Sequence, residues 1–309
     1  MATNYTDCPQ NIADIMQYVV IDKVQCAKKI LMAQKCFFYD TCSFRYHSNM
    51  EHPEYLFEYI KRESGIVVIT RTIIMELASA SHSLNIEYIE YLKKMHGFGI
   101  EILVIYEEDI FEVLNLYYTS NAKINRCLSV AVKVSKNATG TISDVLRENS
   151  GLRQSMMDEK NTDRTLFSCF FSEVRNHKES EDNLGEEMVG ICIHMLSNIL
   201  EPYDFKYIVF TDDKGAIRLI NKVQNNIWTH LEIKPVSAMT TIKLAQKLYQ
   251  QSIITKREQV LEIVSAGTKE NDVKILASEE YDLEPQEKKM TCSELTDKIM
   301  IPNAIHIYS

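Results

Sequence analysis

Acidic residues stand at or just behind the ends of short apolar segments in this chain. Asp40 ends the run CFFYD, Glu76 lies in TIIMELA behind the run GIVVIT, and Asp212 and Asp213 end YIVFTDD. Carboxylates gathered at one place repel each other, and a divalent cation is the usual compensation, because Mg²⁺ and Mn²⁺ prefer hard carboxylate oxygens. The pattern therefore predicts a site for Mg²⁺ or Mn²⁺ built from these four acids.

Each of these acids also has a simpler interpretation. An Asp after a strand is typical of a helix N-cap or a turn, and a helix Glu is commonly solvated or ion-paired. Glu76 has apolar neighbours on both sides, where a solvated surface is less expected. We therefore base the metal-site hypothesis on the set of acids and not on any single one.

A further acid of the site is expected from the segment DNLGEE. Asp182, Glu186 and Glu187 all precede a helical pattern that runs through Met188, Ile191 and Met195. Acids in a first helical turn also complement the helix dipole, so both roles remain open at this point.

The segments between these acids predict the elements that position them. Strands are expected at 36–40, 65–70, 99–106 and 207–213, with a shorter fifth strand at 228–233, and helices at 10–32, 53–62, 73–80 and 85–95. Strands that alternate with helices form right-handed βαβ units and an open parallel sheet. The carboxyl ends of such strands share one edge, where ligands bind. The expected fold is therefore α/β, with a parallel sheet of four to five strands flanked by helices.

Two regions lie outside this alternation. Residues 107 to 181 predict an insertion with one helix near 109–118, the apolar patch CLSVAVKV and polar stretches. Residues 236–309 predict a small α+β region: two helices after Pro235, the strand DVKILAS, a helix with a Thr291 to Glu294 capping box, and a last strand AIHIYS. We expect two units, 1–235 and 236–309.

Composition narrows the classes of function. The chain has a net charge of -9, which makes it a poor general binder of duplex nucleic acid but leaves room for an acidic pocket that receives phosphate through metal ions. The eight cysteines form no CxxC pair and are expected to be thiols. Neither a secretory leader nor a membrane span is expected, which favours a cytoplasmic protein without membrane partners. No GxGxxG follows a strand, which argues against a nucleotide-binding Rossmann protein. No nucleophile elbow is present, which argues against a hydrolase with a catalytic triad.

Four motifs in order resemble those of PIN-like metal-dependent nucleases. YDTCSF resembles the opening Asp-Thr-x-Ser motif, VVITRTIIMELAS the second strand and its helix, DNLGEEMVGICIHML the later acidic helix, and YIVFTDDKGAI the strand that ends in Thr-x-Asp. The resemblance spans 36 to about 233 and is interrupted by the insertion.

The resemblance implies hydrolysis of phosphodiester bonds, most simply by an endoribonuclease acting on single-stranded or structured RNA. It implies catalytic roles for Asp40, Glu76, Glu187 and Asp213, with Glu186 and Asp212 as further metal ligands. Thr41, Ser43 and Thr211 would orient ligands or water, and Arg71, Lys214 and Arg218 would contact phosphate; surface solvation is the simpler role of each cation.

Three questions stay open at this level. The chain is either an active nuclease or a catalytically inert PIN-like scaffold that binds protein. It is compatible with a homo-oligomer and with an inhibitory protein partner. The insertion, which carries Lys133, Arg147 and Arg153 among other cations, is expected either to cap the metal cleft or to pack away from it.

Overall fold

A five-stranded parallel sheet forms the centre of the protein. In the computed structural model, which describes residues 5–179, 182–199, 205–268, 271–279, 282 and 284–308, the strands are β1 (Lys35–Tyr39), β2 (Gly65–Thr70), β3 (Ile102–Ile105), β4 (Tyr207–Phe210) and β5 (Val236–Met239). Their order is β3-β2-β1-β4-β5, and every neighbouring pair is parallel. The expected open α/β sheet is confirmed.

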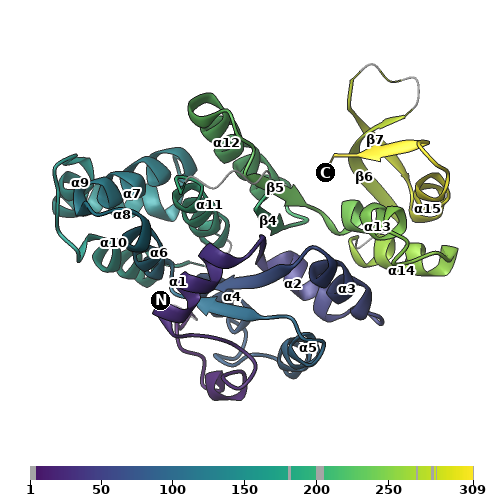
Figure 1. Ribbon diagram of the computed structural model, residues 1–309, viewed down its shortest axis with the longest axis horizontal. Coiled ribbons are helices and arrows are strands. Elements are labelled where there is room, and N and C mark those ends of the chain that lie inside the picture. The colour runs from purple at the N-terminus through teal and green to yellow at the C-terminus, as the bar shows by residue number, and fades with distance from the viewer. Residues whose placement is uncertain are drawn as a thin grey trace.

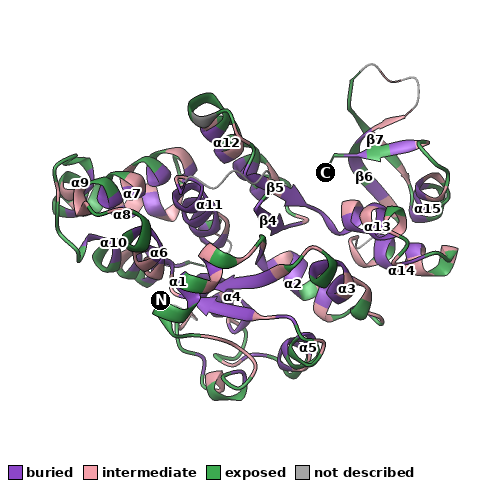
Figure 2. Cartoon of the chain, viewed as in Figure 1, coloured by how far each residue is buried: buried purple, intermediate pink, exposed green. Residues whose placement is uncertain are grey.

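The central strands are almost continuously apolar because helices cover both faces of the sheet. Helix α1 (Lys23–Met32) precedes the first strand, and the connections between strands include α2 (Thr41–Ser48), α3 (Glu54–Arg62), α4 (Arg71–Leu77), α5 (Ile86–Gly97), α11 (Leu184–Leu196) and α12 (Lys214–Leu231). Phe37 of β1, Val68 of β2 and Phe210 of β4 have no exposed surface. Figure 2 shows the strands as the buried centre of the molecule.

Two sequence predictions at this level need correction, the first of them only in part. The helix expected at 10–32 is confirmed in its second half, as α1, whereas its first half holds a short 3₁₀ turn, η1 (Ile12–Asp14), and an extended residue, Val20, which pairs in parallel with Leu103. Helix α1 begins only after Asp22, which accepts a hydrogen bond from the backbone N of Gln25 and caps the helix.

The expected fifth strand at 228–233 was the second error. Residues up to 231 continue α12, which ends where Glu232 adopts a left-handed conformation with φ of 55°. A short alternation of apolar and polar residues, as at 228–233, fits both a strand and a helix. The buried residues Ile220, Val223 and Ile227 have helical spacing and belong to α12. The actual fifth strand, β5, begins directly after the expected boundary at 235, so the parallel sheet takes its edge strand from the region expected to be separate.

The insertion is helical. The 3₁₀ turn η2 (Glu107–Asp109) leads into α6 (Ile110–Tyr117), α7 (Asn121–Ser135), α8 (Thr141–Glu148), α9 (Ser150–Met157) and α10 (Leu166–Asn176). Residues 180 and 181, where the insertion was expected to end, lie outside the described residues. Helices α7 to α10 form a lobe beside the sheet, at the left in Figure 1, and α7 packs against α11 and α12.

The C-terminal region packs on the opposite side of the molecule (Figure 1). It contains α13 (Thr241–Gln250), α14 (Arg257–Ala266), α15 (Cys292–Met300) and a three-stranded antiparallel sheet of β7 (Gln286–Thr291), β6 (Asp272–Glu279) and β8 (Ile305–Ile307). The Thr291 to Glu294 capping box is confirmed. β7 was not expected, because it is an exposed edge strand with polar side chains and no apolar pattern.

No helix among the described parts of the chain is both long and apolar enough to cross a bilayer.

Candidate active site

The site begins at the carboxyl end of β1, where Asp40 is 7% exposed and caps α2. One carboxylate oxygen of Asp40 accepts a hydrogen bond from the backbone N of Thr41 at 2.7 Å. The other accepts from Cys42 Sγ at 2.8 Å and from Thr211 Oγ1 at 2.9 Å. The N-cap interpretation of Asp40 is thus correct, and it does not compete with a site role, because the cap itself holds the carboxylate at the edge of the sheet.

Two threonines join Asp40 to acids from other elements. Thr41 Oγ1 donates to Glu76 Oε2 on α4, the helix that follows β2. Thr211 Oγ1 donates to Asp40 and accepts from the backbone N of Asp213 at 3.2 Å. Asp213 in turn caps α12 by accepting from the backbone N of Gly215 and Ala216. Thr41 and Thr211 thus donate hydrogen bonds to the carboxylates of Glu76 and Asp40.

Helix α11 brings the fourth acid to this place. A methyl group added at Gly215 would lie 2.8 Å from Asp213 Oδ1 and 3.4 Å from Glu186 Oε2, so both carboxylates reach the same point. A methyl group at Gly185 would lie 2.7 Å from Glu76 Oε1. A side chain at 185 or 215 would therefore displace these carboxylates. Asp40, Glu76, Glu186 and Asp213 form what we call the acid cluster.

The acid cluster raises the pKa values of two of its members. Burial, together with the charges of Asp213, Asp40 and Glu76, raises the pKa of Glu186 to about 8. Burial, and to a smaller extent the charge of Glu76, raises the pKa of Asp40 to about 6. Like charges that share a site oppose each other's ionisation, so at neutral pH the cluster holds protons that isolated carboxyl groups would lose.

The raised pKa of Glu186 predicts how stability depends on pH. Between the usual pKa of 4.5 and about 8, the folded protein binds a proton at Glu186 that the unfolded chain does not. Stability contributed by this group must therefore fall as pH rises through that window, and Asp40 acts in the same direction. In EDTA, the melting temperature of the wild type should fall from pH 5 to pH 8 more steeply than that of Glu186→Gln. Parallel curves for the two proteins would show that Glu186 titrates normally.

Lys178 was missed by the sequence analysis. Its side chain is 3% exposed, and its Nζ lies 3.0 Å from Glu76 Oε1 and contacts Asp182. Asp182 also accepts from Thr141 Oγ1 at 2.8 Å and from the backbone N of Leu184, so it holds the start of α11 in place. The spacing of four residues between Lys178 and Asp182 was the available signal, but it lay in a segment without a clear periodic pattern.

Two of the predicted acids lie outside the acid cluster. Glu187 is fully buried; one of its oxygens accepts from the backbone N of Asn137, and burial raises its pKa to about 7. It faces the loop between α7 and α8, so Glu186 and not Glu187 joins the other acids. Consecutive residues of an α-helix point about 100° apart around its axis, and sequence alone did not resolve which of the two faces the other acids.

Asp212 has a separate set of partners. Its carboxylate accepts from Ser43 Oγ at 2.6 Å and from the backbone N and Oγ1 of Thr241 at 2.8 and 2.6 Å. His47 Nε2 contacts the same Thr241 hydroxyl at 3.0 Å. Asp212 therefore joins β4 to the start of α13, and Ser43 contacts it rather than the acid cluster.

The predicted phosphate contacts are divided between two places. Arg71 is 8% exposed and stacks on Tyr106 at 4.4 Å, and its Nε and Nη1 lack hydrogen-bond partners among the described residues. Lys214 and Arg218 line a cavity of about 380 Å³ between α12 and the β6–β7 hairpin, together with Lys274. Lys214 Nζ lies 3.3 Å from Glu287 Oε1.

The acid cluster has the ligand types that a divalent cation prefers, but its side chains are not grouped around a cation site. Four carboxylates are the donors that a hard divalent cation prefers, and Glu186 has no cationic partner among the residues that the structure describes. As the side chains stand, however, no three His, Cys, Asp or Glu residues in the described ranges are grouped so that they could hold a metal ion. Binding would require Asp40 or Glu76 to exchange a present contact for the ion.

The fold and the site define an α/β protein with an open parallel sheet and an acidic cluster at the carboxyl edge. Comparison of the chain with protein-family models, with curated proteins and with solved structures found no match.

Proposed function

We propose that this protein is a metal-dependent endonuclease of the PIN-like type, acting on RNA with Mg²⁺ or Mn²⁺. The observation that carries the proposal is the meeting of Asp40, Glu76, Glu186 and Asp213, from four different elements, at one edge of a parallel sheet. Structural carboxylates are normally paired with cations or spread apart, whereas mutually repelling carboxylates are typical of sites that bind a divalent ion.

The four acids of the cluster would hold the ion. When bound, it would supply Lewis-acid stabilisation of a phosphodiester and lower the pKa of a water. The chain's own residues do the rest: Thr41 and Thr211 fix the orientation of the carboxylates, and Lys178 neutralises Glu76. Lys214 and Arg218, which line the cavity between α12 and the β6–β7 hairpin, would supply positive charge for an RNA phosphate beside Asp212.

The test is cleavage of an unstructured, fluorescently labelled RNA by the purified full-length protein. We expect cleavage with Mn²⁺ or Mg²⁺ and none in EDTA. Single-stranded DNA of the same sequence shows whether the ribose is required. Absence of cleavage of both nucleic acids with either ion would contradict the proposal.

A second candidate is the catalytically inert PIN-like scaffold, and one observation favours it. The oxygens of Asp40 already accept from three protein donors, and Glu76 is already paired with Lys178. Calorimetric titration with Mn²⁺ separates the two functions. Binding that Glu186→Gln weakens supports the nuclease, and absence of Mn²⁺ binding by the wild type supports the scaffold.

A further inference from the structure

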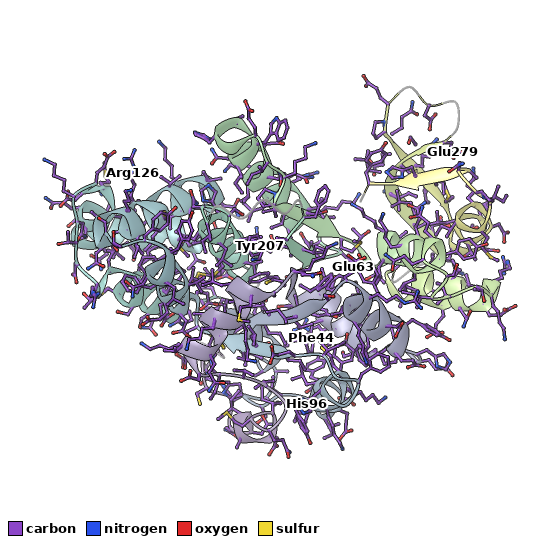
Figure 3. The ribbon with its side chains drawn as sticks, viewed as in Figure 1. Phe44, Glu63, His96, Arg126, Tyr207 and Glu279 are labelled. Atoms are coloured by element: carbon purple, nitrogen blue, oxygen red, sulfur yellow. The ribbon has the colours of Figure 1, made fainter. Side chains whose placement is uncertain are left out.

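A basic groove lies on the helical insertion, away from the acid cluster. It has a volume of about 710 Å³ and is formed by α7, α8 and α9. Five basic side chains line it, against a single acid, Glu159. The basic residues are Arg126, Lys133, Lys136, Arg147 and Arg153. In a chain with a net charge of -9, such a local excess of positive charge is unlike the rest of the composition. Figure 3 labels Arg126 on this lobe.

The cations of the basic groove are only partly compensated within the protein. Arg147 pairs with Asp144 at 2.7 Å, and Arg126 lies 4.0 Å from Glu159, with most of both arginine side chains exposed. Neither Lys133 nor Arg153 forms an ion pair within the described part of the chain. Exposed pairs contribute little to stability, so these side chains remain available to an external anion.

The basic groove also has apolar surface. Met157 is 75% exposed and Val130 is 39% exposed, and both line it. A ligand that suits the basic groove therefore combines regularly placed negative charge with flat apolar groups. Single-stranded RNA has both, because its phosphates contact basic side chains while its unpaired bases cover apolar ones. A duplex hides its bases, and a membrane surface is matched by a convex face rather than a groove.

One contact joins the basic groove to α11, the helix that carries Glu186, and a chain of contacts joins it to Glu76 of the acid cluster. Lys136, at its edge, is followed by Asn137, whose backbone N donates to Glu187, the neighbour of Glu186 on α11. Thr141, at the start of α8, donates to Asp182, which in turn contacts Lys178 beside Glu76. The end of the basic groove near Lys136 therefore lies next to α11, the helix that carries Glu186.

We propose that the basic groove of α7, α8 and α9 binds single-stranded RNA and leads it to the acid cluster. This inference rests on the proposed function for the fate of the RNA, but binding in the groove can be measured without cleavage. It assigns substrate binding to the insertion and not to the sheet.

The experiment is a fluorescence-anisotropy titration of the full-length protein in EDTA, which prevents metal-dependent cleavage. The probe is a fluorescein-labelled oligouridylate of about 20 nucleotides, longer than the ~4–16 nucleotides that typical single-strand sites cover. The groove variant is Lys133→Glu with Arg153→Glu. The control is Lys28→Glu with Lys94→Glu, which makes the same charge change at exposed helical positions of α1 and α5.

We expect the groove variant to lose affinity at least about tenfold and the salt slope to fall by about 1.4, because each phosphate contact on a single strand contributes about 0.7. The control should bind like the wild type. Equal losses in both variants, no loss in either, or binding of phosphatidylserine vesicles in place of RNA would overturn the inference. If the groove binds RNA as expected but the wild type cleaves nothing with Mn²⁺, the proposed nuclease fails while the groove stands.

Discussion

Asp40→Asn is expected to lower RNA cleavage by about 100-fold or more while the protein stays folded. The amide keeps the volume of the carboxylate and can still accept a hydrogen bond from the backbone N of Thr41. It removes the negative charge that a divalent ion requires. Because burial disfavours the charged form of Asp40, removal of the charge offsets part of the stability lost when the amide cannot accept from Cys42 and Thr211.

Asp212→Asn provides the matched control, since it makes the same chemical change at a neighbouring position of the same sheet edge. The carboxylate of Asp212 accepts from Ser43 and from both donors of Thr241. An amide cannot accept all of these, so we expect a loss of about 1.5–3 kcal/mol in stability and a smaller effect on cleavage. Cleavage rates from gel assays and melting curves of both variants compare their effects on cleavage and on stability. Cleavage by Asp40→Asn at the wild-type rate, or unfolding of this variant, would contradict a role for Asp40 in metal binding.

Arg175→Met is expected to destabilise the protein by about 3–5 kcal/mol, the largest effect on stability that the described contacts predict. Arg175 is 5% exposed, and its Nη1 lies 2.8 Å from Glu107 Oε2, which has no exposed surface. Its guanidinium also makes two hydrogen bonds to Glu108. Methionine retains most of the volume but leaves the Glu107 carboxylate buried without a cation.

The rescue variant follows from the second contact of Glu107, which accepts from the backbone N of Thr72 at 2.9 Å. Glu107→Gln combined with Arg175→Met keeps that acceptor and removes the unpaired charge. We expect the double variant to be more stable than Arg175→Met alone, as measured by urea unfolding. A loss below about 1 kcal/mol in the single variant would show that Glu107 is neutralised in another way.

The sequence predicted the sheet well because its strands carry a strong local signal. GIVVIT was placed at 65–70, as in β2, since a β-branched run between a helix and a glycine has few alternatives. The strand β5 was missed because VSAM is short and is followed at once by a helical pattern. The helix α7 was missed although Ile124, Leu128 and Val132 have helical spacing, and α8 and α9 are short helices of 8 residues each with few apolar positions.

The candidate site was predictable in kind but not in detail. Asp40, Glu76 and Asp213 were chosen from their places at strand ends, and all three lie in the acid cluster. The choice between Glu186 and Glu187 depends on the rotation of α11, which packing against α7 and α12 decides. The partners of Asp212 depend on Thr241, a contact across 29 residues that no local pattern encodes.

The contact between Asp212 and Thr241 also bears on the order in which the protein is completed during synthesis. Chains emerge from the ribosome N-terminus first, and their units fold as they appear. Here β5 ends at Met239 and Thr241 follows it, so the edge strand and the partner of Asp212 both arrive after residue 235 has been made. Every acid of the cluster, up to Asp213, is thus made before the edge strand that completes the sheet, and the nascent protein can complete its site only once Thr241 has emerged.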